Sequence, residues 1–259
     1  MNYLKLFLFS IILISCKKKS FADDIVLTNN SKIETKFQEF NEGVHEYGSS
    51  VIYVGKIKDS IPIKYYDSMF PAPPPPPNFY LKTESDKKDS IVFNEMRKKY
   101  FLGDFDRIQF STKPIKFDSL TNDILEIVVK PKDTIPHFVI DSTNKIKAYK
   151  SFPVFIKNIS GKKLILPEMK SLATFAHNKN NKWQLIWNAN AFSCGDSMFN
   201  SRFWILNPDE VIIFSVNYFQ GKEKTKFRIG LTYYFLSEEF EGYINPKLFE
   251  QQRMVYEIK

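Results

Sequence analysis

The chain has 259 residues, a formal charge of +8, 25% charged residues and two cysteines. Its lysines are scattered between apolar residues, so the charge does not form the basic stripe that a nucleic-acid-binding protein needs, and we expect no nucleic acid partner. The 25 Phe and 13 Tyr residues, against nine Gly, favour β-sheets, and we expect an all-β fold.

Residues 1–15 have the pattern of a lipoprotein signal peptide. Lys5 precedes a mainly apolar run, Leu6–Ile14, which is about half the roughly 20 residues that a membrane-spanning helix needs. The sequence Leu13-Ile14-Ser15-Cys16 resembles the bacterial lipobox, in which the cysteine receives diacylglycerol and the chain is cut before it. We therefore expect a lipid anchor at Cys16 that binds the membrane. An ordinary cleaved secretory signal is the alternative.

Residues 16–30 are expected to form a lipidated tether. Lys17, Lys18 and Lys19 would either lie against anionic headgroups or belong to a solvated linker. With Cys16 acylated, Cys194 has no partner within the chain, which excludes an intrachain disulfide framework. The lipoprotein signal predicts a location in the cell envelope, at the outer membrane. It does not indicate whether the protein faces the periplasm or the exterior.

Residues 31–148 are expected to form a β-rich N-terminal domain. The capping-box pair Ser31 and Glu34, followed by apolar residues at helical spacing, predicts a short helix at residues 32–42. Apolar alternation over residues 50–65 then predicts a β-hairpin.

A proline-rich loop at residues 71–77 divides this domain. It favours a stiff polyproline II connection, and a docking site for an aromatic groove is the alternative. Further short strands, with a helical turn at residues 94–101, are expected at residues 78–82, 90–93, 105–110, 124–130 and 137–140.

Residues 149–259 are expected to form an immunoglobulin-like antiparallel β-sandwich with a C-terminal helix. Two long strands, 212–218 and 227–235, are expected to form the central hairpin of the core. Asn245-Pro246 predicts the start of a helix at residues 246–254. Further strands are expected at residues 152–156, 164–166, 172–177, 183–189, 202–206 and 239–244, and Asn180-Asn181 predicts a hairpin turn between 172–177 and 183–189. About seven strands in roughly a hundred residues match the size of an immunoglobulin-like domain.

Several short motifs resemble uncharacterised lipoproteins of the Bacteroidetes group. They include Val54-Gly55-Lys56-Ile57-Lys58-Asp59-Ser60-Ile61 in the first half, and Pro153-Val154-Phe155-Ile156-Lys157-Asn158 and Ser193-Cys194-Gly195-Asp196-Ser197 in the second. The resemblance spans most of the mature chain. It implies a place in the cell envelope and brings no assigned activity.

A triplet of Asp, then Ser or Thr, then an apolar residue or Thr recurs along the chain. It resembles the O-glycosylation signal of exported Bacteroidetes proteins, in which the hydroxyl carries the glycan. The alternative is structural, since Asp and Ser side chains hydrogen-bond nearby backbone in turns. The candidate hydroxyls are those of Ser60, Ser68, Ser90, Ser119, Thr134, Ser142 and Ser197.

Catalytic chemistry has one candidate pair in the sequence, a Cys194 nucleophile with His177 as its base. No local motif supports the pair. The favoured interpretation is that Cys194 is a small residue in a Cys-Gly-Asp turn. A further alternative is that it forms an intermolecular disulfide. The sequence lacks metal-ligand spacing and a phosphate-binding glycine loop. We expect no enzyme activity, no cofactor and no metal.

Trp183, Trp187 and Tyr234 are the candidate ligand platform, because aromatic rings on a strand face can stack on sugars. The alternative is that these rings fill the core. The favoured function is non-catalytic binding of a protein or a glycan by a lipid-anchored envelope protein. The alternatives are an immunity-type lipoprotein that blocks a toxin in the periplasm, and a cysteine-dependent hydrolase using Cys194 and His177.

Overall fold

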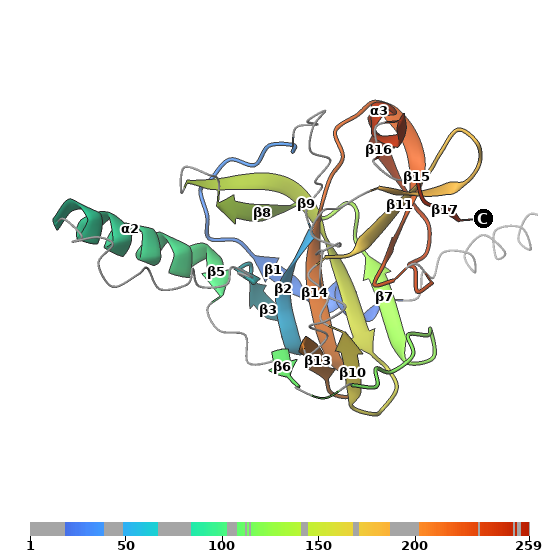
Figure 1. The fold of residues 1–259 in the computed structure, drawn as a ribbon, viewed down its shortest axis with the longest axis horizontal. Helices are drawn as coiled ribbons and strands as arrows, with labels where there is room; N and C mark the ends of the chain where they lie inside the picture. The colour runs from blue at the N-terminus through green and yellow to red at the C-terminus, as the bar shows by residue number, and fades with distance from the viewer. Residues whose placement is uncertain are drawn as a thin grey trace, which may run out of the picture.

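Strands dominate the computed structural model of the chain (Figure 1). The structure describes residues 19–38, 49–66, 84–102, 108–111, 113, 115–140, 145–167, 171–186, 202–232, 234–250, 252 and 255–258. Within these residues lie two five-stranded sheets, a three-stranded sheet and two strand pairs. This confirms the expected all-β class with mainly antiparallel sheets. The immunoglobulin-like topology stays a prediction.

The first five-stranded sheet, which we name the central sheet, separates two hydrophobic cores. Its strands are β2 (Ser49–Lys56), β14 (Glu210–Asn217), β9 (Ile146–Asn158) and β7 (Leu125–Val129), with β8 (Ile135–Ile140) paired to β9. All eight residues of β14 are buried, since both of its faces are covered. Ile212 and Phe214 belong to one apolar cluster, whereas Val211 and Ile213 belong to the other.

The second five-stranded sheet, which we name the outer sheet, begins at an edge strand. Its order is β16 (Phe240–Ile244), β15 (Glu223–Gly230), β11 (Ala173–His177), β12 (Trp183–Ile186) and β17 (Glu257–Ile258). The predicted β11–β12 hairpin is confirmed, and Asn181 has a φ of 58° in its turn. The predicted C-terminal helix is confirmed as the shorter α3 (Lys247–Glu250), where the Lys247 N–H donates to Asn245 Oδ1 at 3.1 Å.

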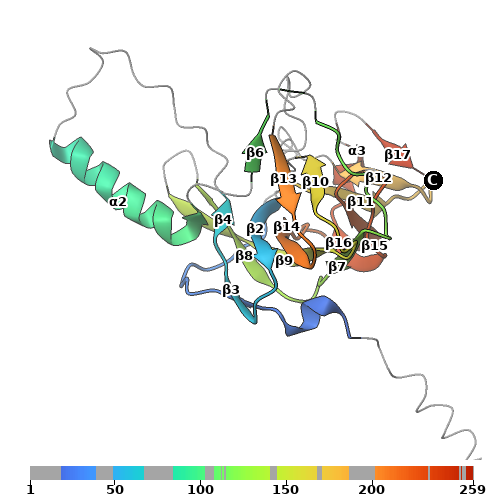
Figure 2. The same ribbon diagram turned by 90° about the horizontal axis from the view of Figure 1, so that it is seen from below.

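The described residues also form smaller sheets and a long helix. The three-stranded sheet contains β10 (Leu164–Pro167), β13 (Arg202–Leu206) and β6 (Ile108–Phe110), while β1 (Val26–Thr28) pairs with β3 (Ser60–Pro62) and β4 (Tyr65–Tyr66) with β5 (Phe101–Leu102). A 3-10 turn, η1, spans Phe21–Asp24. Helix α2 (Glu84–Tyr100) projects from the body in both ribbon views (Figures 1 and 2). The ring of Tyr100 packs on Phe138 at 4.7 Å and fastens the end of α2 to β8.

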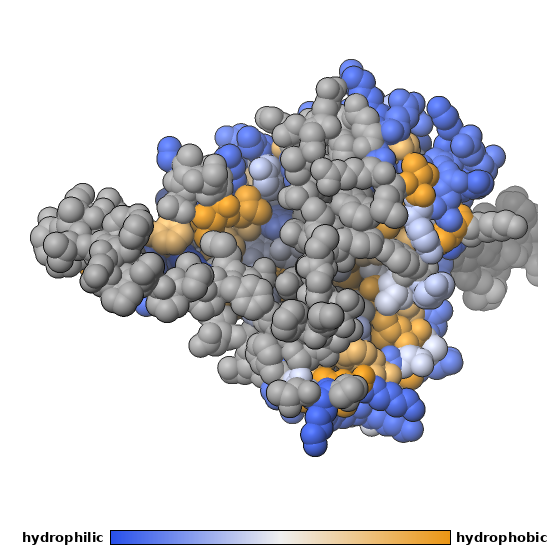
Figure 3. All heavy atoms as spheres, viewed as in Figure 1, coloured by the Kyte–Doolittle hydropathy of each residue, from blue (hydrophilic) through white to orange (hydrophobic). Residues whose placement is uncertain are grey.

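The outward face of the β15–β16 pair carries a ladder of ion pairs. Lys224 Nζ lies 2.8 Å from Glu241, and Glu239 lies 2.9 Å from Lys226 and 2.8 Å from Arg228. Hydrophilic residues dominate the described surface at this end of the molecule (Figure 3). Alternate residues of a strand point to opposite faces, so the charged residues of β15 face solvent while its apolar ones are buried.

Two predicted hairpins are wrong in their strand pairing. β14 pairs with β2 and β9, whereas β15 pairs with β11 and β16, so the two strands expected to form the central hairpin lie in different sheets. Residues 60–62 form β3, which pairs in parallel with β1 and not with β2. Alternating hydrophobicity locates a strand, but it specifies the partner weakly when both faces of that strand are apolar.

The helix predicted at residues 32–42 is wrong for the part that the structure describes. Residues 32–38 are not helical and run beside β9, where the Lys36 N–H donates to the Ala148 carbonyl at 3.1 Å and the Lys150 N–H donates to the Lys36 carbonyl at 2.8 Å. These tertiary contacts outweigh a weak local helix preference. Residues 39–42 lie outside the described residues. The strand predicted at residues 90–93 is also wrong, because these residues belong to α2.

The expected boundary between residues 148 and 149 falls inside β9, which runs through it without a break. β2 precedes this boundary and pairs with β14, which follows it. β7 and β8 also precede the boundary, and both pair with β9. The two halves of the chain therefore share the central sheet. The proline-rich loop at residues 71–77 lies outside the described residues.

Candidate functional site

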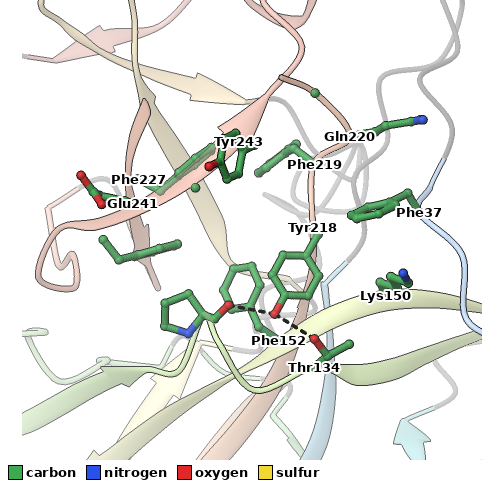
Figure 4. A pocket seen from close by; sticks show the side chains of 14 residues that line it. Phe37, Thr134, Lys150, Phe152, Tyr218, Phe219, Gln220, Phe227, Glu241 and Tyr243 are labelled. Carbon is green, nitrogen blue, oxygen red and sulfur yellow. Dashed lines mark hydrogen bonds between the residues drawn. The ribbon is translucent and has the colours of Figure 1, made fainter. Parts of the chain in front are cut away.

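A pocket of about 520 Å³ opens between the central sheet and the outer sheet (Figure 4). Five segments meet there: the N-terminal segment beside β9, the β7–β8 turn, β9 itself, the β14–β15 connection and the β15–β16 pair. The residues that line it are Phe37, Pro131, Thr134, Lys150, Phe152, Tyr218, Phe219, Gln220, Gly221, Phe227, Phe240, Glu241, Gly242 and Tyr243.

Stacked phenyl rings form one wall of this pocket. The rings of Phe219 and Phe227 lie 5.4 Å apart at an interplanar angle of 6°, and those of Phe227 and Phe240 lie 5.7 Å apart at 23°. The Phe152 ring meets Phe240 edge-on at 5.6 Å and Tyr218 at 5.1 Å. Ring pairs in these geometries attract each other beyond the gain from burial alone. The wall is therefore ordered before a ligand enters.

Tyr218 supplies the best-placed polar group of the pocket. Its hydroxyl donates to the Pro131 carbonyl oxygen at 2.8 Å and lies 3.4 Å from Thr134 Oγ1. Its backbone N–H donates to the Lys150 carbonyl at 3.0 Å, which fixes where the side chain leaves the sheet. Burial raises the pKa of the Tyr218 phenol, so this group stays a neutral donor in the physiological range.

The rim of the pocket carries the positive side chain of Lys150. Lys150 Nζ lies 4.9 Å from the centre of the Phe37 ring, a cation–π contact. The Glu241 carboxylate points away from the pocket (Figure 4), and a hydrogen bond from Lys224 on the outward face lowers its pKa. The lining thus combines apolar walls with a polar rim, an arrangement suited to holding a ligand.

Two glycines allow the pocket walls to approach each other. A Cβ on Gly221 would lie 1.9 Å from the backbone carbon of Ile244, which no shift of a side chain could relieve. A Cβ on Gly242 would lie 2.8 Å from the Phe227 ring. A larger residue at Gly221 would push the β14–β15 connection away from β16, and a larger residue at Gly242 would press on the Phe227 ring.

Behind the pocket, buried hydrogen bonds tie β14 to the N-terminal segment. Asn217 Nδ2 donates to Gln38 Oε1 at 2.7 Å, and Asn217 Oδ1 accepts from His137 Nδ1 at 2.6 Å. The Tyr65 ring stacks on His137 with centroids 4.9 Å apart. Burial lowers the pKa of His137 to about 4, so the imidazole is neutral at pH 7. These buried hydrogen bonds fix the position of Asn217, which directly precedes Tyr218 in the chain.

The structure separates the residues of the predicted ligand platform. Trp183 is only 7% exposed, and the Arg228 guanidinium covers its ring at 4.6 Å, so this ring offers no open stacking face. Tyr234 is 90% exposed, in the connection between β15 and β16. Trp187 lies outside the described residues.

Of the residues predicted to be reactive or lipidated, the structure describes only His177. His177 ends β11, where its ring contacts Trp183 at 5.2 Å and its carbonyl accepts a hydrogen bond from the Thr225 hydroxyl at 2.6 Å. Cys194 and the lipidation candidate Cys16 lie outside the described residues.

The candidate glycosylation sites occupy different environments. Ser60, Ser119 and Thr134 are exposed, and Thr134 lines the pocket. Ser90 belongs to α2. The three remaining candidates, Ser68, Ser142 and Ser197, lie outside the described residues.

Sequence reasoning missed the pocket itself. It assigned the alternating aromatic residues of the second half to strand faces in a core, and it did not place Phe37 or Lys150 beside them. The pocket joins segments that are far apart in the chain, as the hydrogen bond between Gln38 and Asn217 shows across 179 positions. The available signal was the excess of Phe and Tyr, which indicates aromatic clusters but not which rings meet.

Comparison with known proteins gave no match to a family model, a curated protein or a solved structure. Among the described residues, neither helix combines the length and apolarity needed to cross a membrane. The same residues hold no group of three or more His, Cys, Asp or Glu side chains arranged to bind a metal ion. The pocket is therefore the candidate functional site of the described residues.

Proposed function

We propose that this protein is a non-catalytic binding protein of the cell envelope that holds a protein partner in the aromatic pocket. The observation that carries the proposal is the pocket of about 520 Å³ walled by stacked phenyl rings. Ligand sites typically have volumes of about 300–1,000 Å³, with apolar walls and a few polar groups that orient the ligand. Tyr218, Thr134 and Gln220 would be those polar groups.

The lining favours an apolar side chain of a protein partner over a sugar. Phe152, Phe219 and Phe227 offer no hydrogen-bonding atoms, so sugar hydroxyls placed among them would lose their water without gaining partners, at a cost of about 1–3 kcal/mol each. A large apolar side chain instead gains about 1.5–3 kcal/mol on full burial.

The proposed location depends on the sequence. The apolar run and Leu13-Ile14-Ser15-Cys16 support a lipid anchor at Cys16, and the resemblance to Bacteroidetes lipoproteins supports the outer membrane. An anchor of this kind would hold the pocket within reach of other envelope proteins.

Photocrosslinking in living cells tests the proposal. The photoreactive residue p-benzoylphenylalanine replaces Gln220, which is exposed at the pocket, in the full-length protein. We expect one discrete protein adduct on illumination. The matched control places the same residue at Asn180, an exposed turn position outside the pocket, and should give no such adduct.

A second variant shows whether the adduct depends on the pocket. Thr134→Trp adds an indole to an exposed lining position and should abolish the Gln220 adduct while the protein still accumulates in the envelope. Equal adducts at the two crosslinking positions, or an adduct that persists in Thr134→Trp, would exclude the pocket as the binding site.

A further inference from the structure

We infer that the partner presents an extended peptide segment, which pairs with the outer edge of β16 and places one large apolar side chain in the aromatic pocket. The inference rests on the proposed function, because it specifies the partner of the same pocket. Its two supports are the unpaired edge of β16 and the position of the pocket beside that edge.

β16 is the terminal strand of the outer sheet. β15 pairs with it along one side, from Glu223 opposite Ile244 to Phe227 opposite Phe240. Peptide groups of a strand point alternately to its two sides, so about half of those in β16 point away from β15. Within the described part of the chain, neither a strand nor a backbone hydrogen bond occupies that second side over residues 240–243. Such an edge is a template for a further strand.

The pocket opens along the same strand. Glu241, Gly242 and Tyr243 line it on one side (Figure 4). Because Gly242 has no side chain, the backbone of β16 itself borders the pocket at that point. Phe37 is 40% exposed and Tyr243 is 58% exposed, so apolar surface continues from the pocket to its rim. A chain lying on the edge would therefore have an apolar cavity directly beneath one of its side chains.

A peptide supplies both kinds of contact that this arrangement offers. Its amide groups pair with the edge, and its side chains alternate, so that one enters the pocket while its neighbours point to solvent. A glycan or an acyl chain lacks a regular series of amide groups and would use the pocket alone.

Backbone methylation of a probe peptide tests the pairing without altering the protein. The probes are fluorescent heptapeptides in which threonines flank a central Phe, Tyr, Trp, Leu or Ile. Fluorescence anisotropy reports their binding to the purified full-length protein in detergent, against a detergent blank. The tightest probe is then made in two forms, N-methylated at its odd or at its even positions. Since alternate N–H groups point to opposite sides of a strand, one form should bind at least tenfold more weakly and the other should bind unchanged.

The outcomes separate this inference from the proposed function. Thr134→Trp should weaken binding of the unmethylated probe at least tenfold, whereas Asn180→Trp should not change it. Equal affinities for the two methylated forms would overturn the pairing with β16. If no probe binds while the Gln220 crosslink forms, the peptide inference fails and the pocket function stands. If neither the probes nor the crosslink report binding, both proposals fail.

Discussion

The Tyr218 hydroxyl donates a 2.8 Å hydrogen bond to the carbonyl oxygen of Pro131, 87 positions earlier in the chain. The bond ties the end of β14 to the turn between β7 and β8, on the side of the pocket opposite β16. Both residues belong to segments continuous with the central sheet. This half of the pocket is therefore fixed by the sheet, and the outer sheet supplies the other half.

Replacing Tyr218 by Phe should lower stability while keeping the pocket walls. The variant removes the hydroxyl and leaves the ring against Phe152, so we expect the free energy of unfolding to fall by about 0.5–1.5 kcal/mol, the net value of one hydrogen bond. Urea titration measures the change. Tyr234→Phe is the control, because that side chain is 90% exposed, and it should change stability by less than about 0.5 kcal/mol. Equal effects of the two variants would contradict a structural role for the Tyr218–Pro131 bond.

Gly221→Ala should be far more damaging than Gly161→Ala. The added methyl at Gly221 would meet the Ile244 backbone at 1.9 Å, whereas at Gly161, whose φ is +67°, nothing lies within 4 Å. The first change overpacks the contact between the β14–β15 connection and β16 and should cost about 3 kcal/mol or more. Gly161→Ala adds only the strain of a non-glycine residue in the left-handed conformation, which costs about 1–2 kcal/mol. Thermal unfolding of both variants gives the order, and an equal loss of stability would show that β16 can move away from Gly221.

Cys16→Ser should abolish lipid attachment, since serine lacks the thiol that the lipobox resemblance assigns to diacylglycerol transfer. Cells fed an alkyne-bearing fatty acid provide the measurement, because a lipidated protein becomes labelled by click chemistry. The wild-type protein and the control Cys194→Ser should both be labelled, and Cys16→Ser should not. Label retained in Cys16→Ser would place the lipid elsewhere or remove the lipoprotein assignment.

Strand positions followed from the sequence better than strand partners did. The sequence predicted β7 at residues 124–130, within one residue of Leu125–Val129 at either end, and Asn180-Asn181 before Trp183 predicted the β11–β12 hairpin. These elements depend on local periodicity and turn chemistry. β14 is buried throughout, so its sequence marks a strand with two apolar faces without indicating that β2 and β9 are its neighbours.

The pocket could not be predicted because its contacts are non-local. Ser31 and Glu34 form a capping-box pattern, yet the segment after them lies against β9 and contributes Phe37 to the pocket. Phe37 and Tyr218 meet at 6.5 Å only once the central sheet has formed. A single sequence contains no periodicity that links two such positions, so it indicates the aromatic content of the site but not its assembly.

Stability should decrease as the pH falls from about 6.5 to about 4, because His137 is buried as a neutral ring. Its pKa is lowered from 6.5 to about 4 in the folded protein, so between these values the unfolded chain binds a proton that the folded chain does not. The contribution is complete above pH 6.5 and is lost toward pH 4, with a difference of about 3 kcal/mol for this shift. Urea titrations at pH 7.5, 5.5 and 4.5 measure the trend.

His137→Asn separates this effect from the titration of carboxylates over the same range. The Asn amide can donate to Asn217 Oδ1 as the imidazole Nδ1 does at 2.6 Å, but it cannot take up a proton. The variant should be less stable than the wild type at pH 7.5, because the stacking on Tyr65 is lost, and should then lose less stability on acidification. The difference between the two proteins should shrink as the pH falls. If the wild type and His137→Asn lose the same stability on acidification, His137 is protonated equally in the folded and unfolded chains. That result would contradict the burial of His137 behind its hydrogen bond to Asn217.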